Sequence, residues 1–464
     1  MPASLLSRRS ALRLALAGSF ACGVHGASWV LTRRPGRPRL ATFAADVTVP
    51  LGHGMMGGAW VAKSIADPLE ARGFVLRDGD LTVVFVSVDW CEIRNEAYAR
   101  WQTVLAAAAG TTPERVLIST IHQHDTPVAD LGAERILRAR HLAGSVCDPE
   151  FHEQAVQRVG RAVAESMRRM QPVNALGTGA ARVTGVASNR RYRMPDGSIQ
   201  FDRMSATRNA FAIAGEEGLI DPWLRTLSFW HGDEELAAVS FYAVHPMSYY
   251  GQGEVSADFP GLARRRRQEE TPRSFQIYSS GCSGNLTAGK YNTGARENRP
   301  VLADRLYQGL RAAAAATRKI GWSTLRFRSV PLPLEPRSSP GFTREDLEHT
   351  LEVEKRPFQQ CLAAMGLSWR QRTETGRPIN IPCVTLGPAR LLVLPGEAYI
   401  EYQLAAQRLQ PDAFVCVAGY GDGATGYIPT EQHWAEHDTN LADWCWVAPG
   451  SEARLRSALE KVLR

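Results

Sequence analysis

Short apolar runs with the pattern of buried strands alternate with helical stretches along most of the 464-residue chain. Strands are predicted at 81–89, 116–124, 275–280 and 413–417, and hairpins at 224–244 and 379–395. Helices are predicted at 97–109, 151–170, 299–318, 343–365, 399–409 and 451–463. Hairpins are antiparallel, so the chain is predicted to be mixed α/β, with mixed parallel and antiparallel sheets flanked by helices.

The basic charge of the chain lies in its first 39 residues. The formal net charge is +7, and this segment contains seven arginines and no acidic residue. The remainder therefore balances to zero, which gives no support for nucleic-acid binding. With 44% hydrophobic and 22% charged residues, the composition also excludes a disordered or fibrous chain.

Residues 1–31 have the pattern of an export signal. Ser7-Arg8-Arg9-Ser10-Ala11-Leu12-Arg13 resembles a twin-arginine signal, and an uncharged stretch follows at 14–31. The alternative is an uncleaved membrane anchor, although this stretch is at the short limit for a span. We expect a linker at 32–40 and a periplasmic or secreted protein.

Cysteine usage gives no sign of a thiolate metal site. Seven of the eight cysteines follow the predicted signal, and none forms a Cys-x-x-Cys pair. Which of them form disulfides in an oxidising compartment is left open.

Three of the eleven histidines stand at the ends of apolar runs. His122 and His124 end the run at 116–124, where residues two apart on a strand point to the same face, a geometry that metal sites use. His245 ends another run, and Pro246 stops strand pairing there. The alternative for each is a core histidine satisfied by hydrogen bonds.

Three later segments have a similar form. Glu397 follows an apolar run and a Pro-Gly turn, and Tyr427 ends a stretch with four glycines at 419–426. The alternatives are a helix N-terminal acid and a loop aromatic, respectively. The small residues at 281–292 suit close approach of the backbone to an anion, although the spacing around Lys290 is not that of a Walker A loop.

Together these motifs resemble the N-terminal catalytic domain of the neutral/alkaline (non-lysosomal) ceramidases. The resemblance runs from residue 46 to about residue 450 and implies the fold of that domain. The immunoglobulin-like C-terminal domain of full-length ceramidases has no counterpart, so we expect a single domain over 41–464. The matching motifs are Asp46-Val47-Thr48-Val49-Pro50-Leu51-Gly52, Val86-Ser87-Val88-Asp89, 119–127, Asn189-Arg190-Arg191, His245-Pro246, 256–261, Leu394-Pro395-Gly396-Glu397 and Gly426-Tyr427.

The resemblance implies one catalytic Zn²⁺. Its implied ligands are His122, His245, Glu397 and Tyr427. His124 and Arg190 would contact the oxyanion or the leaving group. Zinc would lower the pKa of a bound water to about 7 and polarise the scissile carbonyl.

The sequence departs from the family at the position of the proposed nucleophilic serine, where Thr287 stands. Thr287 remains a candidate catalytic residue, but the aspartate and proline that flank the serine in the family are also missing. Gln123 and Asp125 replace Thr and Ser of the family's Thr-His-Thr-His-Ser-Gly-Pro motif, and a later tyrosine has no counterpart near residue 437. Metal ligation is therefore better supported than ceramide as the substrate.

The leading hypothesis is a zinc-dependent hydrolase of an amide bond, with an N-acyl lipid or small-molecule amide as substrate. One alternative is a zinc hydrolase of another amide or an ester, and a second is a non-catalytic lipid- or glycan-binding protein. The arginine run at 264–267 is predicted to be a solvated helix face, with transient contact to a membrane surface as the alternative.

Overall fold

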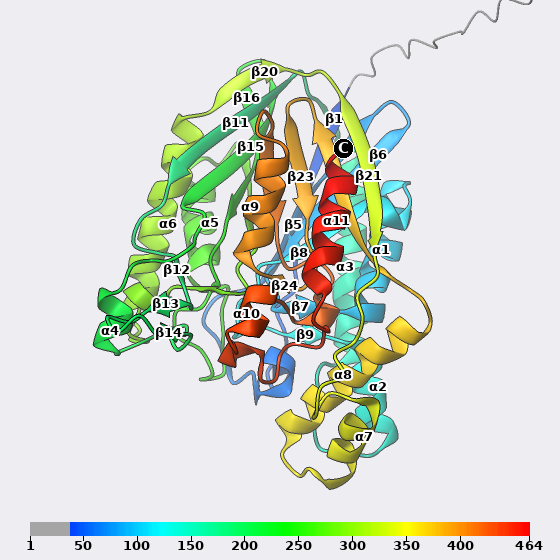
Figure 1. The fold of residues 1–464 in the computed structure, drawn as a ribbon. Coiled ribbons are helices and arrows are strands. Elements are labelled where there is room, and N and C mark those ends of the chain that lie inside the picture. Colours follow the sequence, from blue (N-terminus) through cyan, green and yellow to red (C-terminus); the bar gives the residue numbers. More distant parts are fainter. Residues whose placement is uncertain (1–37) are drawn as a thin grey trace, which may run out of the picture. The chain divides into compact units, whose positions relative to one another are not determined.

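Three mixed sheets form the centre of the computed structural model, which describes residues 38–464 (Figure 1). All the elements below belong to one compact unit, Arg37–Arg464. The first sheet has the order β10 (Gln171–Pro172), β1 (Arg39–Asp46), β5 (Glu70–Asp78), β6 (Leu81–Val88), β8 (Val116–Thr120). The second has the order β18 (Phe275–Ser280), β16 (Glu234–Tyr242), β15 (Trp223–His231), β11 (Ala175–Arg182), β20 (Arg318–Gly321). The third has the order β21 (Leu325–Leu332), β22 (Ile379–Leu386), β23 (Ala389–Val393), β25 (Phe414–Ala418).

Each sheet ends in one parallel pair of strands joined by a helix. The pairs are β6–β8, β16–β18 and β23–β25, and their connecting helices are α1 (Asn95–Ala109), α5 (Asp258–Glu270) and α9 (Ile400–Leu409). All other strand pairings within the three sheets are antiparallel, so the predicted mixed α/β class is confirmed. Because the strands of a parallel pair run in one direction, their carboxyl ends share one edge of the sheet.

The three carboxyl-terminal edges meet. Thr120 N, at the end of β8, donates to Tyr420 O at 2.9 Å, and Gly419 N donates to Ser280 O of β18 at 2.8 Å. Ser119 and Ser279 of the first and second sheets are joined through their hydroxyls at 3.0 Å. Ligands of open α/β sheets bind at such edges, so this junction is where a site is expected.

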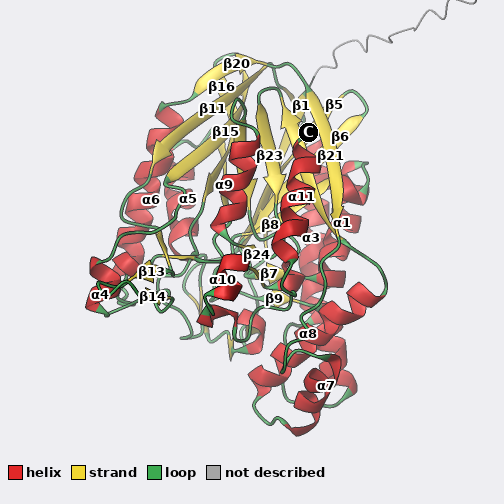
Figure 2. Cartoon of the chain, in the orientation of Figure 1, coloured by secondary structure: helices red, strands yellow, loops and turns green. Residues whose placement is uncertain are grey.

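An apolar interior packs between the sheets. One cluster of buried side chains takes members from all three, with Phe74 of β5 and Phe229 of β15 in tilted ring contact at 5.0 Å and Leu391 of β23 beside them. Helices cover the outer faces: α1 and α3 (Pro149–Met167) on the first sheet, α5 and α6 (Asn298–Ala315) on the second, and α9 and α11 (Ser451–Leu463) on the third (Figures 1 and 2). The remaining helices are α2 (Leu131–Ala139), α4 (Ala210–Ala214), α7 (Arg344–Val353), α8 (Pro357–Glu374) and α10 (Glu431–Ala435).

Six two-stranded sheets of the described chain lie in the segments that connect the elements of the three large sheets, and several of them are seen below those sheets in Figure 1. They are β12 (Ser188–Asn189) with β19 (Leu286–Thr287), β13 (Tyr192–Arg193) with β14 (Ile199–Gln200), β17 (Glu254–Val255) with β4 (Ser64–Ile65), β2 (Gly54–Met55) with β3 (Trp60–Val61), β24 (Glu397–Ala398) with β26 (Tyr427–Ile428), and β7 (Glu92–Ile93) with β9 (Val128–Ala129).

The predicted helix at 343–365 is wrong in one respect, because it is two helices. α7 begins with a capping box formed by Thr343 and Asp346, and α8 begins at Pro357. A proline disfavours the helical conformation of the residue before it, and Arg356 is extended, with ψ at 120°. The chain therefore breaks there.

The arginine run at 264–267 is only in part the solvated face that the sequence predicted, because Arg266 is exposed whereas Arg264 is not. Arg264 is buried and its guanidinium binds Asp89, with Nη1 and Oδ1 at 2.7 Å. The next three arginines pair with Asp67, Asp304 and Glu270. Arg264 therefore belongs to the packing between α5 and the first sheet, whereas Arg266 makes a surface ion pair with α6.

The predicted export signal at 1–31 and most of the linker lie outside the described residues. β1 begins at Arg39, so Arg39 and Leu40 at the end of the predicted linker belong to the first sheet. Within residues 38–464, every helix is too short or too polar to cross a lipid bilayer. The seven cysteines in this part of the chain are buried, free thiols.

Candidate metal centre

The structure brings the four predicted ligand residues to the junction of the three sheets. His122 is the second residue after β8 and His245 the third after β16. Glu397 and Tyr427 begin β24 and β26, two parallel strands in which they are direct partners. All four are buried, with Tyr427 the most exposed at 9%.

Three of these side chains point their ligand atoms at one place. His122 Nε2 lies 3.2 Å from Glu397 Oε2, and His245 Nε2 lies 3.7 Å from the same oxygen. The three ligand atoms all lie within 4.8 Å of one another. Glu397 Oε2 is buried, yet it has no hydrogen-bond partner among residues 38–464. A buried carboxylate oxygen without a donor is costly unless a cation is bound there.

These spacings fit a metal ion. Ligands about 2.1 Å from a tetrahedral zinc lie about 3.4 Å from one another. The two measured distances to Glu397 Oε2 bracket that value. Two imidazoles and a carboxylate are also a ligand set that catalytic zinc uses, with further positions open.

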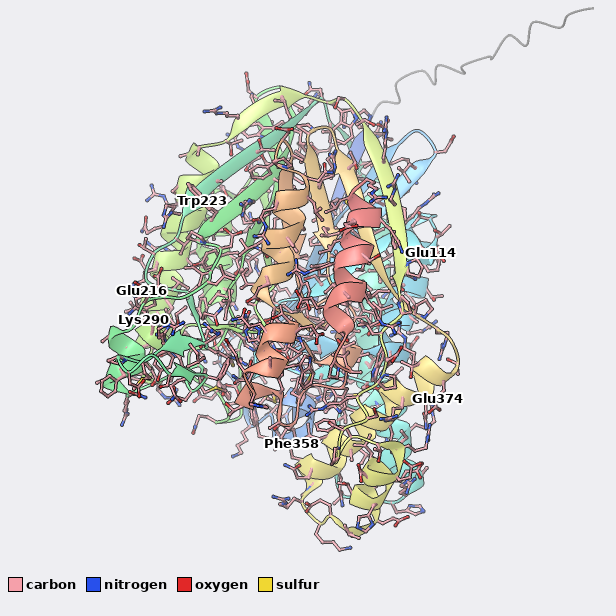
Figure 3. The ribbon with its side chains drawn as sticks, in the orientation of Figure 1. Glu114, Glu216, Trp223, Lys290, Phe358 and Glu374 are labelled. Carbon is pink, nitrogen blue, oxygen red and sulfur yellow. The ribbon has the colours of Figure 1, made fainter. Side chains whose placement is uncertain are left out.

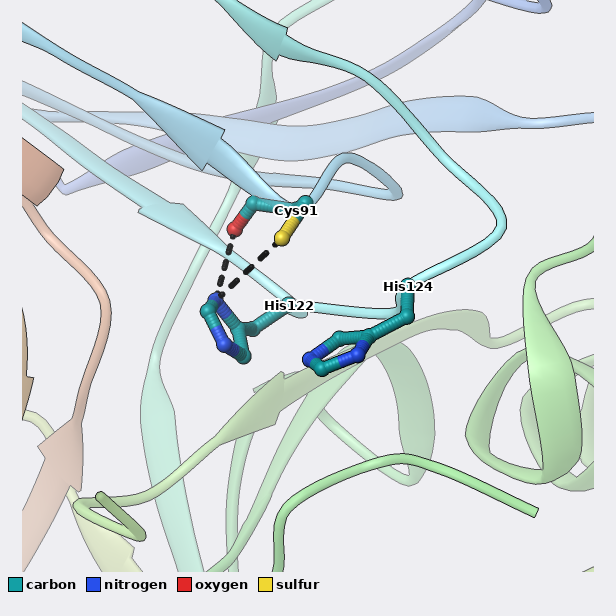
Figure 4. A group of neighbouring side chains, drawn as sticks. All are labelled: Cys91, His122 and His124. Carbon is teal, nitrogen blue, oxygen red and sulfur yellow. Dashed lines mark hydrogen bonds between the residues drawn. The ribbon is translucent and has the colours of Figure 1, made fainter. Parts of the chain in front are cut away.

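The hydrogen bonds of the two histidines leave Nε2 free to bind a metal. His122 Nδ1 lies 3.0 Å from the carbonyl oxygen of Cys91, and a carbonyl can only accept, so we assign the ring proton to Nδ1 (Figure 4). His245 Nδ1 lies 3.1 Å from the carbonyl oxygen of Ser283. Partners of this kind fix the tautomer and orientation of metal-binding imidazoles.

Arg190 binds the fourth predicted ligand. Its Nη1 donates to the phenol oxygen of Tyr427 at 2.7 Å, and its Nη2 lies 3.3 Å from His245 Nδ1. Arg190 is 2% exposed and its guanidinium has no carboxylate partner within the described chain at ion-pair distance. A fixed positive charge thus borders the ligand cluster.

His124 lies beside the cluster without joining it. Its Nε2 is 3.3 Å from His245 Nε2, but His124 is not among the three residues whose ligand atoms converge on Glu397. Its Nδ1 has no partner among the described residues. Burial, with Arg190 and His122 as further causes, lowers the pKa of His124 well below the ordinary value, so the ring is neutral at neutral pH.

Aromatic side chains form a wall next to His124. The ring of Tyr250 meets His124 edge-on at 4.8 Å, and Trp60 stacks on Tyr250 at 5.7 Å. Asp125 holds this wall, because its Oδ1 accepts from Trp60 Nε1 at 2.9 Å and from Gly251 N at 3.0 Å. Burial raises the pKa of Asp125 to about 6.

Glycines directly before two of the predicted ligands explain the Pro-Gly-Glu and Gly-Tyr motifs. Gly396 and Gly426 have φ of 53° and 60°. An added Cβ would lie 2.1 Å from Thr425 Oγ1 and 2.1 Å from Trp444 O, respectively. Only glycine fits these positions, which aim Glu397 and Tyr427 into the cluster.

The two histidines of the first motif do not meet for the reason that the sequence suggested. The predicted strand 116–124 ends at Thr120, and His122 has φ of 71°. A non-glycine residue at positive φ is strained, and such strain concentrates at functional sites. The rings of His122 and His124 lie 5.4 Å apart because of this turn, and not because of strand alternation (Figure 4).

Thr287 is buried and its hydroxyl is already bonded on both sides. Thr287 Oγ1 donates to Met204 O at 2.5 Å and accepts from Gly289 N at 3.1 Å. Further along the same segment, Lys290 Nζ reaches Ile213 O at 2.5 Å, beside α4 (Figure 3). Within the segment 281–292, the carbonyl of Ser283 is the group that contacts a proposed ligand, His245.

Three residues at the centre were not predicted as site residues. Cys91 and Ser283 contact the histidines through their main-chain carbonyls, which any residue type offers, so these two contacts leave no signal in the sequence. Tyr420 stacks on His122 at 4.2 Å with 13° between the ring planes. Its place in the glycine-rich stretch at 419–426 was the available signal.

Comparison with known proteins gives matches in structure alone. No model of a known protein family matches the chain, and no curated protein sequence matches it. A crystal structure of neutral ceramidase from Pseudomonas aeruginosa superposes with a TM-score of 0.68, covering 92% of this chain and 74% of that one at 20% identity. The chain has the neutral ceramidase fold.

A second structure, described as a ceramidase complexed with C2, matches with a TM-score of 0.67 at 19% identity. It covers 92% of this chain and 75% of that one. Both matches confirm the fold that the sequence motifs implied. At this identity the likeness to the neutral ceramidases is one of fold, and the chemistry must be argued from the centre itself.

Proposed function

We propose that the chain is a zinc-dependent hydrolase of an amide bond. The observation that carries the proposal is the orphaned Glu397 Oε2, which faces the Nε2 atoms of two histidines whose Nδ1 atoms each face a main-chain carbonyl. His122, His245 and Glu397 would hold the metal, with Tyr427 as the fourth protein ligand. Residues 1–31 support export to the periplasm or the medium as part of the same proposal.

Zinc in such a ligand set supplies a Lewis acid that polarises a carbonyl and activates water. The chain's own residues would orient the substrate around it. The buried guanidinium of Arg190 offers positive charge where the carbonyl oxygen becomes negative, and such a contact is typically worth about 3 kcal/mol. His124, a neutral ring with Nδ1 unpartnered, can accept a proton there and pass it to the leaving nitrogen.

The substrate class proposed is an N-acyl amide, and ceramide itself is expected to be poor or inactive. The neutral ceramidase fold supports a lipid amide, whereas the changed motif at Asp125 and the altered serine segment favour another member of the class. The aromatic wall of Trp60 and Tyr250 offers an apolar contact next to His124.

A substrate panel tests this proposal. Zinc-loaded protein is expected to turn over at least one compound among N-acyl sphingoids, N-acyl amino acids and simple N-acyl amines, and to lose that activity with a chelator. Aryl esters and phosphoesters are the comparison compounds. Zinc-dependent turnover of phosphoesters alone would show that the protein is a phosphoesterase and not an amidase. Binding of lipids by fully metallated protein, without turnover of any compound, would show that it is a lipid-binding protein.

Thr287→Ala is expected to retain turnover within about tenfold of the wild type. The hydroxyl is engaged with Met204 and Gly289, and a hindered secondary alcohol is a poor nucleophile without an adjacent base. Loss of a true nucleophile costs on the order of 10⁴-fold or more in kcat. The assay is kcat on the best panel substrate, with zinc content measured in parallel. A loss of that size with zinc retained would assign the covalent role to Thr287.

A further inference from the structure

Tyr420 touches both imidazoles of the proposed metal centre. Its ring lies parallel to that of His122 at 4.2 Å, and its hydroxyl oxygen lies 3.3 Å from His245 Nδ1. Its main-chain carbonyl accepts from Thr120 N, so the residue is fixed to the end of the strand that carries His122. Tyr420 is 1% exposed and has φ of 54°.

The hydrogen bonds around Tyr420 define the direction of each proton. Ser283 Oγ lies 3.2 Å from Gly281 O, a carbonyl that can only accept, so we assign the serine proton to that contact. With this assignment, the contact of 2.7 Å between Ser283 Oγ and Tyr420 Oη uses the tyrosine proton. The tyrosine oxygen is left as an acceptor toward His245 Nδ1.

This direction matters because it favours one tautomer of His245. Two acceptors, Ser283 O and Tyr420 Oη, face Nδ1 and favour a proton there, which leaves the lone pair on Nε2 for a metal. The competing neighbour is Arg190 Nη2 at 3.3 Å, a donor that would favour the opposite tautomer. Tyr420 opposes that effect.

We infer that Tyr420 is a positioning residue of the metal centre, which holds His122 by stacking and keeps His245 in the metal-binding tautomer through Ser283. The inference rests on the proposed zinc site and deepens it. Tyr420 is buried and contacts both imidazoles, so its expected effect is on metal affinity and on the geometry of the ligands.

The test compares zinc affinity, measured by competition with a chelator, in the wild type, Tyr420→Phe and Ser283→Ala. Tyr420→Phe keeps the ring on His122 and removes only the hydroxyl. Losing a partner of this kind typically weakens metal binding about 10- to 100-fold. Ser283→Ala is expected to act in the same direction, because the tyrosine proton is then free to turn toward His245 Nδ1. The zinc affinity of the double variant should equal that of the single variant with the lower affinity, because both substitutions act through the same chain of hydrogen bonds.

Tyr98→Phe is the matched control. Tyr98 is a buried tyrosine of α1 whose hydroxyl donates to Ile118 O at 3.2 Å, and its loss should leave zinc affinity unchanged. The visible absorption of the cobalt(II)-substituted protein is the second readout, because it reports ligand geometry independently of activity. A shift is expected in Tyr420→Phe and not in Tyr98→Phe.

Wild-type affinity and an unchanged cobalt spectrum in Tyr420→Phe would overturn the inference while leaving the zinc site in place. Equal losses in Tyr420→Phe and Tyr98→Phe would reduce Tyr420 to a packing residue. A wild-type protein that binds neither zinc nor cobalt would overturn the proposed site and this inference with it.

Discussion

His245→Ala is expected to lose the zinc and, with it, all amide hydrolysis. The imidazole is fully buried, it supplies one of three converging ligand atoms, and alanine offers no replacement. Wild-type protein should contain about one zinc per chain, as catalytic sites of this ligand type do. Metal analysis of dialysed protein and turnover of the best panel substrate are the two measurements.

His152→Ala is the matched control for that experiment. His152 is an equally inaccessible histidine of α3, at 2% exposure, in a helix that packs on the far side of the first sheet from the other two sheets. Its replacement should change stability without changing zinc content. Stoichiometric zinc in folded His245→Ala protein would remove His245 from the centre and would require a different ligand set.

Arg264→Ala is expected to destabilise the protein by about 3–5 kcal/mol, because it leaves the buried carboxylate of Asp89 without its partner. Arg264 binds both oxygens of Asp89, at 2.7 and 3.0 Å, and also Glu70 at 2.8 Å. The side chains of Arg264 and Asp89 are 2% and 0% exposed. The measurement is the free energy of unfolding from the urea transition.

Arg266→Ala, two residues along the same helix, provides the comparison. Arg266 pairs with Asp304 at 2.6 Å, and both side chains are 52% exposed. Water screens such a pair, so its loss should cost less than about 1 kcal/mol. Equal effects of the two substitutions would show that the Arg264–Asp89 pair adds nothing beyond a surface contact.

The local elements of the fold were predictable where the apolar pattern is strong. The structure confirms the predicted strand at 275–280, the predicted helix at 451–463 and both predicted hairpins. These elements could be predicted because turn residues or polar residues mark their ends. β11, with the sequence ALGTGAAR, was not predicted, since its glycines and alanines lack the bulk of a typical strand. Its pairing with β15 and β20 is set by tertiary packing, which the local sequence pattern does not report.

The candidate centre was predictable as a set of residues and not as a geometry. His122, His245, Glu397 and Tyr427 were named as ligands because their motifs resemble those of the neutral ceramidases, and the structure places these residues at one junction. The left-handed turn at His122 and the hydrogen bonds around Tyr420 depend on backbone angles and through-space contacts. Arg264 was mistaken for a surface residue because its partner Asp89 is 175 positions away.

The spacing of the proposed ligands along the chain has a consequence for biosynthesis. They stand at 122, 245, 397 and 427; the first two follow strands of the first and second sheets, and the last two lie in the separate pair β24–β26. The amino-terminal strands leave the ribosome and can begin to fold long before Tyr427 is made. Metal therefore cannot guide the early steps of folding, and a nascent or truncated chain that ends before residue 427 lacks part of the ligand set. Zinc bound with native affinity would therefore indicate a polypeptide that extends at least to residue 427.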